Sequence, residues 1–317
     1  MRVLLTGSSG WLGRFLAPRL MRAGHTVIGL DVVPGAATDV VGSVAERSVV
    51  DRVFADHGEA VIHAGALHKP DIARFPAQAF VDVNVAGTLN LLQAAACAGH
   101  DRFVFTSTTS LMISQAIRDG EGAAAVWLDE TTGPLEPRNI YGVTKLAAEG
   151  LCRLFALEHG LNCAVLRTSR FFPEDDDTIR DIHGENLKAV ELLCRRLTVE
   201  DAAEAHVAAL AKASGFEVFV VSAPTPFARS DVAALKSDAA GVIARYFPDA
   251  PALFAQRGWL LPRSIGRIYD STKAERLLGF RAGTDFASVL RALREGAPLP
   301  FAHDPDYVSP STRLANG

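Results

Sequence analysis

The chain has 317 residues and a mass of 33.8 kDa, which allows one large domain or two smaller ones. Hydrophobic residues make up 49% of it, enough for a substantial core. A formal net charge of −4, a pI near 6.1 and the lack of any run of basic residues disfavour nucleic acid and anionic membranes as partners. Small molecules are the expected partners.

The cysteines and the N-terminal residues indicate the cellular compartment of the protein. The four cysteines show no CxxC spacing and no histidine pair at a metal-ligand distance, so we expect reduced thiols and no metal site. The apolar run near the N-terminus is followed at once by glycine and is too short for a signal peptide or a membrane span. These features predict a cytoplasmic protein.

Short apolar runs alternate with helical patterns along the chain. Continuous apolarity predicts strands that are buried on both faces, as in a parallel sheet covered by helices. Such runs occupy 2–7, 25–31, 60–65, 102–108, 163–169 and 216–223. Helical periodicity occupies 11–23, 78–98, 141–159, 200–213 and 285–294, and Pro18 should kink the first of these helices or displace its start.

This alternation predicts an α/β fold, a Rossmann-type doubly wound parallel sheet with a smaller C-terminal substrate-binding region. We place an NAD-binding domain at 1–170, with its sheet completed by about 198–223, and the smaller region at 171–317. The tail from Ala297 to Gly317 is proline-rich and lacks periodicity, so it should be loosely held or packed as an irregular arm.

A glycine loop follows the first predicted strand. The stretch "TGSSGWLG" places Gly7, Gly10 and Gly13 in a GxxGxxG spacing that runs into a helix. Glycines allow a tight turn and a close approach to a pyrophosphate, while the helix start offers free amides and a positive dipole. The loop predicts dinucleotide binding, although a plain strand-to-helix turn would also use glycine.

The second predicted strand ends in Asp31. A carboxylate at this position can accept both ribose hydroxyls of an adenosine but would repel a 2′-phosphate. Val32 and Val33 follow with no arginine that could hold that phosphate. The sequence therefore favours NAD over NADP, the alternative being that Asp31 is only a turn residue.

Tyr141 and Lys145 lie four residues apart in "YGVTK" and should share one face of a helix. An ammonium near a tyrosine favours the phenolate, so the pair could form an acid/base site. Upstream, "FVFTSTTS" brings hydroxyls to the carboxyl edge of the sheet, where Thr108 would hydrogen-bond a substrate oxygen while Tyr141 moves the proton. Helix capping is the alternative role for any one of these hydroxyls.

Taken in order, these motifs resemble the extended short-chain dehydrogenase/reductases, the group that contains nucleotide-sugar epimerases and dehydratases. The resemblance also includes "VIHAGA", "NVAGTLNLL" and "VEDAAEAHVAAL", covers 1 to about 210, and continues in "STKAERLLGF". It implies that Tyr141 is the catalytic acid/base, that Lys145 lowers the pKa of Tyr141 and holds the nicotinamide ribose, and that Thr108 completes the catalytic site. The NAD-binding residues it implies are Gly7, Gly10, Trp11, Leu12, Gly13, Asp31, Val32, Ser43, Val44, His63, Ala64, Gly65, Thr106, Tyr141 and Lys145.

The strand at 163–169 leads into "FFPE", which is similar to the uronate dehydrogenases of the same group. Only about 24 residues separate Pro173 from Thr198, too few for the insertion that usually holds a nucleotide diphosphate in this group, and they include the acidic "EDDD". Arg170 stands where relatives carry an asparagine and could bind a substrate carboxylate; alternatively it pairs with Glu174 or another acid of that run. The expected substrate-binding residues are His68, Thr108, Thr109 and Arg170.

The resemblance implies an NAD-dependent oxidoreductase that moves a hydride at a secondary alcohol or ketone of a sugar-like or sugar-acid substrate. The alternative is a sugar or nucleotide-sugar epimerase that retains NAD through the cycle. A cofactor-sensing binding protein is disfavoured because Thr108, Tyr141 and Lys145 are all retained. A homodimer is also implied, with helices at about 84–98 and 141–159 forming a four-helix interface.

Overall fold

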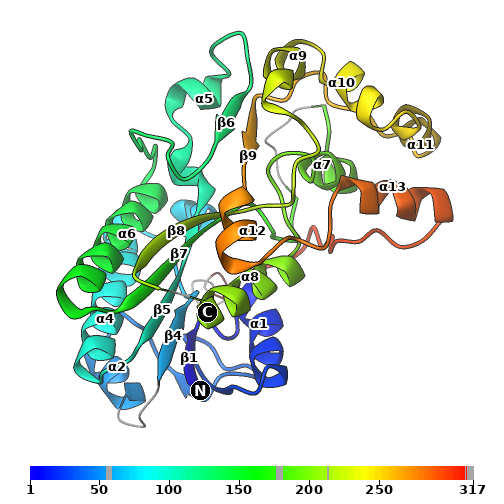
Figure 1. The fold of residues 1–317 in the computed structure, drawn as a ribbon. Helices are drawn as coiled ribbons and strands as arrows, with labels where there is room; N and C mark the ends of the chain where they lie inside the picture. Colours follow the sequence, from blue (N-terminus) through cyan, green and yellow to red (C-terminus); the bar gives the residue numbers. More distant parts are fainter. Residues whose placement is uncertain (55–58, 176–180, 213, 311, 313–317) are drawn as a thin grey trace.

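The computed structural model describes residues 1–54, 59–175, 181–212, 214–310 and 312, which form a large lobe and a smaller one (Figure 1). A seven-stranded parallel sheet, in the order β3-β2-β1-β4-β5-β7-β8, lies at the centre of the large lobe. Its strands are β1 (Arg2–Thr6), β2 (Thr26–Asp31), β3 (Val40–Val41), β4 (Ala60–His63), β5 (Arg102–Thr108), β7 (Asn162–Thr168) and β8 (Phe216–Val221). The doubly wound α/β fold expected from the apolar runs is confirmed.

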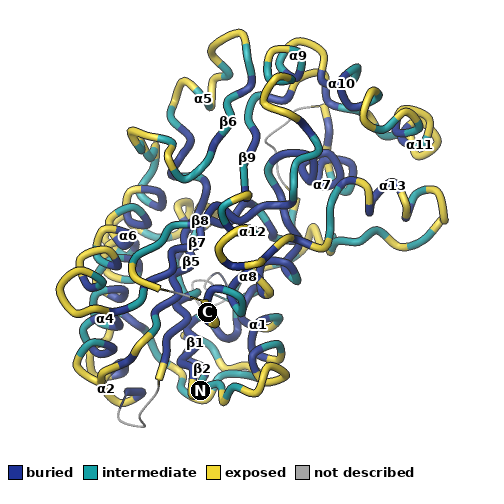
Figure 2. Tube along the Cα trace, in the orientation of Figure 1, coloured by how far each residue is buried: buried dark blue, intermediate teal, exposed yellow. Residues whose placement is uncertain are grey.

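Helices cover both faces of this sheet (Figure 1). One face packs against α2 (Arg47–Phe54), α4 (Gly87–Cys97) and α6 (Ile140–His159). The other packs against α1 (Trp11–Arg22), α8 (Val199–Lys212) and α12 (Thr272–Leu278). With an apolar core on each face, the strands have no solvent-facing side, which explains their continuous apolarity (Figure 2).

The order of the strands reverses direction at the centre of the sheet. From β1 the chain winds outward through β2 to β3, then returns to the other side of β1 as β4 and continues through β5 and β7 to β8. Ligands of open α/β sheets bind at the carboxyl ends of the strands on either side of such a point. The ends of β1, β2, β4 and β5 therefore define where the site should lie.

Two helical predictions differ in detail from the structure. α1 runs from Trp11 to Arg22 with Pro18 inside it, so proline does not displace its start. The pattern at 78–98 is divided into α3 (Ala77–Phe80), a π-helical segment η2 (Val81–Ala86) and α4. Within η2 the Asn84 amide bonds both the backbone N–H and the carbonyl of Leu67, which ties this segment to the loop after β4.

The smaller lobe was largely missed by periodicity. It contains a two-stranded parallel sheet of β6 (Val126–Leu128) and β9 (Arg267–Tyr269) and has its own apolar core. Its helices are α7 (Gly184–Glu191), α9 (Val232–Ser237), α10 (Ala239–Tyr246), α11 (Ala250–Gln256) and α13 (Phe286–Glu295). Only α13 was expected, because the other helices are short and interrupted by turn residues.

Segments between the large sheet and the small lobe shape the cavity described below. They are η1 (Lys69–Ala73), η3 (Thr109–Met112) and α5 (Gln115–Asp119), while η4 (Arg229–Asp231) directly precedes α9. Residues 126–128 join the smaller sheet although they precede α6, so the two lobes are not simply consecutive along the chain.

The tail packs as an irregular arm. The Asp304 N–H donates to the Pro173 carbonyl oxygen at 3.0 Å, and the Lys188 ammonium lies 2.8 Å from His303 Nδ1. Farther along, the ring of Tyr307 lies 5.2 Å from that of Trp11 at the start of α1.

Within the described ranges, no helix is long and apolar enough to cross a bilayer.

Candidate active site

The glycine loop joins β1 to α1 in a tight turn. Gly7 has a φ of 72°, and a Cβ built on it would lie 2.7 Å from the Gly65 nitrogen. A Cβ on Gly13 would lie 2.1 Å from the Gly7 carbonyl oxygen. No side chain caps the start of α1 and no acidic residue stands in its first turn, so its amides remain available to an anion. The loop fits a dinucleotide pyrophosphate.

Asp31, at the end of β2, is tied to this loop. One carboxylate oxygen accepts from the Ser9 N–H at 2.9 Å and the other from the Val33 N–H at 3.2 Å. Burial raises the pKa of Asp31, and these hydrogen bonds partly offset the rise. A carboxylate can accept further bonds, so this geometry leaves room for ribose hydroxyls.

The other expected cofactor residues divide into loop and core positions. Val32 is 39% exposed, beside Asp31. Ser43 Oγ accepts from the Ala45 N–H at 3.2 Å, and Val44 is buried under α4, where a Cβ on Gly87 would lie 2.6 Å from its side chain. Ser43 therefore stabilises its own turn. Trp11 and Leu12 open α1, with Leu12 in the core.

His63 has a buried side chain at the end of β4. Its ring nitrogens lie 2.7 Å from Thr6 Oγ1 and 3.1 Å from Thr88 Oγ1, and burial, followed by the charge of Lys145, lowers its pKa to about 3. The imidazole is therefore neutral and held inside the protein. Ala64 and Gly65, which follow it, lie against Gly7.

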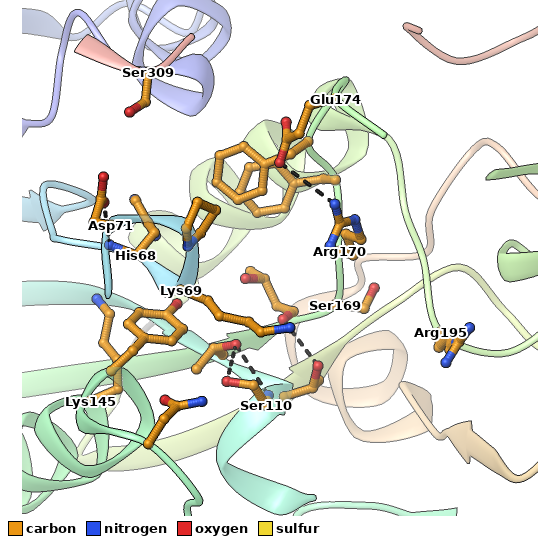
Figure 3. Close-up of a pocket in the computed structure, with 18 of the residues that line it drawn as sticks. His68, Lys69, Asp71, Ser110, Lys145, Ser169, Arg170, Glu174, Arg195 and Ser309 are labelled. Atoms are coloured by element: carbon orange, nitrogen blue, oxygen red, sulfur yellow. Dashed lines mark hydrogen bonds and ion pairs between the residues drawn. The ribbon is translucent and has the colours of Figure 1, made fainter. Parts of the chain in front are cut away.

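A cavity of about 770 Å³ opens at the carboxyl end of the sheet (Figure 3). Thr108, Tyr141 and Lys145 all line it, so the structure brings the proposed catalytic residues together. His68, Thr106, Thr109 and Arg170 line it as well. In the part of the chain that is described, no group of three His, Cys, Asp or Glu side chains could hold a metal ion.

Tyr141 and Lys145 lie one turn apart on α6 and are both buried. The Lys145 ammonium donates to the Thr106 carbonyl oxygen at 2.8 Å and lies 4.5 Å from the centre of the Phe105 ring. Burial raises the pKa of Tyr141 to about 12, a hydrogen bond with Thr108 opposing the rise, and burial lowers the pKa of Lys145 to about 7. Desolvation thus shifts the pKa of Tyr141 in the direction opposite to the one expected from Lys145.

The hydroxyls at the end of β5 point in different directions. Thr108 Oγ1 accepts from the Ser110 N–H at 3.1 Å and so caps η3, the role that was the alternative to substrate binding. Thr106 Oγ1 lies 2.7 Å from His206 Nε2 on α8, so only its carbonyl oxygen faces Lys145. Thr109 Oγ1 donates weakly to the Thr168 carbonyl oxygen at 3.4 Å.

A buried ion pair holds α6 against the sheet. Arg167 on β7 donates to both carboxylate oxygens of Glu149 at 3.1 and 2.7 Å, and Ser107 Oγ donates to the same carboxylate at 2.6 Å. Glu149 lies four residues beyond Lys145, so this network fixes the helix face that carries the catalytic pair. Neither member of the pair stood out in the sequence.

His68 lies beside Tyr141. Its ring centre is 5.9 Å from the Tyr141 ring and 5.4 Å from that of Phe172. Burial, followed by the charge of Lys145, lowers the pKa of His68 to about 3, so the imidazole is neutral at pH 7. A neutral imidazole here can exchange hydrogen bonds with a substrate hydroxyl.

Arg170, just beyond β7, makes the ion pair that the sequence left as its alternative role (Figure 3). Its guanidinium lies 3.6 Å from Glu174 and donates to the Asp175 carbonyl oxygen at 3.3 Å. Both side chains line the cavity and are mostly buried. This pairing supports the structural alternative, and no observation tests a substrate contact by Arg170. The rest of the acidic run, 176–177, lies outside the described residues.

Sequence reasoning missed several residues of the cavity. They include Arg118, Arg138 and Arg267, the buried Ser169, Arg195, and an arm formed by Pro305, Tyr307, Val308, Ser309 and Thr312. None belongs to a local motif, because they come from separate segments that only the fold brings together.

The sequence model of the NAD dependent epimerase/dehydratase family matches residues 3–222. The chain belongs to this family. The match spans the glycine loop, Asp31, the hydroxyls after β5 and the Tyr141–Lys145 pair. It confirms the expected resemblance and, with it, NAD as the cofactor of the family.

The names of several curated relatives of this chain refer to sugars or nucleotide sugars. UDP-glucose 4-epimerase of Azospirillum brasilense is 32% identical over 52% of this chain and 48% of its own. L-arabinose 1-dehydrogenase (NAD(P)(+)) of Haloferax volcanii is 30% identical over 55% of this chain and 69% of its own. The chain thus spans only about half the length of the first of these relatives.

Solved structures share the fold over nearly the whole chain. An NAD-bound short-chain dehydrogenase/reductase superfamily protein from Agrobacterium tumefaciens has a TM-score of 0.66 at 23% identity, covering 93% of this chain and 95% of its own. A mutated uronate dehydrogenase has a TM-score of 0.63 at 19% identity, covering 100% and 94%. At these identities the likeness establishes the fold alone.

Proposed function

We propose that this protein is an NAD-dependent dehydrogenase that oxidises a secondary alcohol of a sugar-like or sugar-acid substrate. The observation that carries the proposal is that Thr108, Tyr141 and Lys145 line one cavity at the carboxyl edge of the sheet. The glycine loop, with the uncapped start of α1, lies at the same edge. Proton transfer and cofactor binding would thus be combined at one site.

In this proposal Tyr141 moves the proton. Thr108 hydrogen-bonds the substrate hydroxyl and directs it toward the phenol, which must be deprotonated to accept the proton. Lys145 has a pKa of about 7, so its protonation state can change at neutral pH when the charge of a neighbouring group changes. NAD supplies the hydride acceptor when it is bound.

The residues that would hold the cofactor follow from the geometry. Gly7, Gly10 and Gly13 would receive the pyrophosphate at the start of α1, and Asp31 the adenosine ribose. Lys145 would bond the nicotinamide ribose. Ser43 and Val44 would border the adenine, and Thr106 would contribute through its backbone.

The sugar-like substrate is supported by the names of the relatives and by the cavity. Its volume of about 770 Å³ accommodates a sugar beside the nicotinamide, and hydroxyl and imidazole groups line it. His68 and Thr109 would contact sugar hydroxyls. The catalytic set does not distinguish a free sugar from a sugar acid.

An epimerase that retains its cofactor is the second candidate, favoured by the UDP-glucose 4-epimerase among the relatives. Absorbance of NADH with a panel of sugars and sugar acids separates the two functions. Net NADH formation supports the dehydrogenase. Inversion of a sugar without net NADH supports the epimerase and contradicts the main proposal. Tyr141→Phe should abolish either activity, and Tyr246→Phe, at a 40% exposed tyrosine outside the cavity, is its matched control.

We also propose a homodimer located in the cytoplasm. Val143, Leu154 and Leu157 on α6 are 48%, 42% and 73% exposed, a stripe that a partner's α4 and α6 could cover. Leu91 and Leu92, by contrast, are buried within the chain. Light scattering at micromolar concentration should give twice the chain mass, and a monomer would reject the dimer.

The proposed cytoplasmic location is supported by the cysteines. All four cysteines are free thiols, in keeping with a reducing compartment.

A further inference from the structure

Three of the arginines that line the cavity come from segments far apart in the sequence. Arg118 comes from α5, Arg138 precedes α6 and Arg267 lies on β9, yet all three line the cavity that contains Tyr141. Among the described residues, none of the three has a carboxylate within ion-pair distance. Figure 1 shows α5, β6 and β9 next to one another, above the large sheet.

The cavity's own carboxylates are engaged elsewhere. Glu174 faces Arg170 at 3.6 Å, and Glu191 faces Arg195 at 3.3 Å and Arg196 at 3.0 Å. Asp71 accepts from the His68 N–H at 2.7 Å, and Asp175 lies 3.9 Å from His303. None of these acids neutralises the three arginines.

In two of the three arginines, Nε makes a hydrogen bond within the protein, and the two terminal nitrogens of the guanidinium stay available to a ligand. Arg138 Nε donates to the Ile113 carbonyl oxygen at 2.9 Å, and Arg267 Nε donates to the Tyr269 hydroxyl at 3.3 Å. A planar guanidinium held at Nε presents its two terminal nitrogens as a fork for an anion.

Uncompensated charge is evident at Arg138. Burial, followed by the positive charges of Arg118 and Arg267, lowers the pKa of Arg138. Asp119 opposes the shift more weakly, and that acid already accepts two bonds from Gln115. Arg118 and Arg138 are exposed and Arg267 is half-buried, so water screens part of their mutual repulsion, and a bound anion would offset the rest.

Arg138 is also coupled to both catalytic segments. It precedes Tyr141 by three residues, so their backbones lie within about 10 Å. Its carbonyl partner, Ile113, follows Thr108 by five residues through η3. An anion bound by this arginine would therefore share the cavity with the reacting hydroxyl.

We propose that Arg118, Arg138 and Arg267 form a subsite for a dianionic phosphoryl group on the substrate. Three terminal phosphoryl oxygens and two negative charges match three guanidiniums better than one carboxylate does. This inference rests on the proposed function only for the end of the substrate that reacts with NAD. The three arginines would bind the opposite end of the substrate, which carries the phosphoryl group. A phosphorylated sugar is therefore the expected substrate class.

Binding of inorganic phosphate tests the subsite without requiring turnover. Calorimetry on the full chain should show saturable phosphate binding, weakened about tenfold or more in Arg118→Gln, Arg138→Gln and Arg267→Gln. Arg52→Gln, an exposed arginine on α2 outside the cavity, is the matched control and should bind like wild type. Acetate at equal ionic strength should not compete. Absent or variant-independent phosphate binding overturns the subsite.

Turnover then identifies the source of the phosphoryl group. NADH formation should be most efficient with a sugar phosphate, and the three glutamine variants should raise KM for it with little change for the unphosphorylated sugar. A preference for the sugar carboxylate, or phosphate binding that leaves sugar-phosphate KM unaffected, overturns the substrate assignment. If phosphate binds through the three arginines but no sugar yields NADH, the dehydrogenase proposal fails and the anion subsite stands.

Discussion

Two groups among the arginines that line the cavity differ in what neutralises their charge. Arg170 and Arg195 lie within ion-pair distance of Glu174 and Glu191, each acid four residues from its arginine. Arg118, Arg138 and Arg267 have no such acid within the described residues. The first group compensates charge internally and shapes the cavity, whereas the second leaves charge for a ligand. Arginine content alone would not separate the two roles.

The largest expected effect on activity is that of replacing Tyr141, which lines the same cavity as both groups of arginines. Tyr141→Phe should lower kcat by about 10²–10⁴-fold, because the ring still packs but no group carries the proton. NAD affinity should stay near that of wild type. Steady-state NADH formation and NAD titration measure both, with Tyr246→Phe as the control. Retention of more than about a tenth of the activity would assign the base elsewhere.

The pH dependence of oxidation should identify the same group. Burial raises the pKa of Tyr141 to about 12, so its reactive phenolate is a minor species at neutral pH. Each unit of rising pH increases the phenolate fraction about tenfold, and kcat/KM for oxidation should rise across pH 6 to 9. A flat profile for wild type would contradict proton transfer through Tyr141.

Arg170 and Arg138 provide the direct comparison of the two groups. Arg170→Ala should lower the melting temperature by roughly 1–3 °C, since a partly exposed ion pair contributes little, and should hardly change KM. Arg138→Gln should do the reverse, raising KM about tenfold with a near-native melting temperature. Both quantities are measured on each variant. A higher KM with unchanged stability in Arg170→Ala would return Arg170 to the substrate site.

The smallest effect concerns cofactor choice. Wild type should use NAD better than NADP, and Asp31→Ala should narrow the gap by removing the repulsion of the 2′-phosphate. Because Asp31 also accepts from Ser9 and Val33, the variant should lose some affinity for both cofactors. Fluorescence titrations with NADH and NADPH report each affinity. Tighter binding of NADPH by wild type would contradict the role of Asp31.

Local signals determined the large lobe and the catalytic pair. The strands of the sheet are continuous apolar runs because both faces are buried, and the six runs expected from the sequence all form strands. The glycine loop and the Tyr141–Lys145 pair follow from fixed spacings on one turn and one helix face. Such features need only neighbours in sequence to be recognised.

Other features were decided only by tertiary structure. The direction of the pKa shift of Tyr141 depends on burial by distant segments, which spacing on a helix does not report. Arg170 pairs with Glu174 only four residues along the chain, whereas the surroundings of Arg138 come from the fold, which brings Arg118 and Arg267 near it. Sequence determined which residues can carry charge, and the fold decided which charges are neutralised, because Coulomb interactions depend on distance in space and not along the chain.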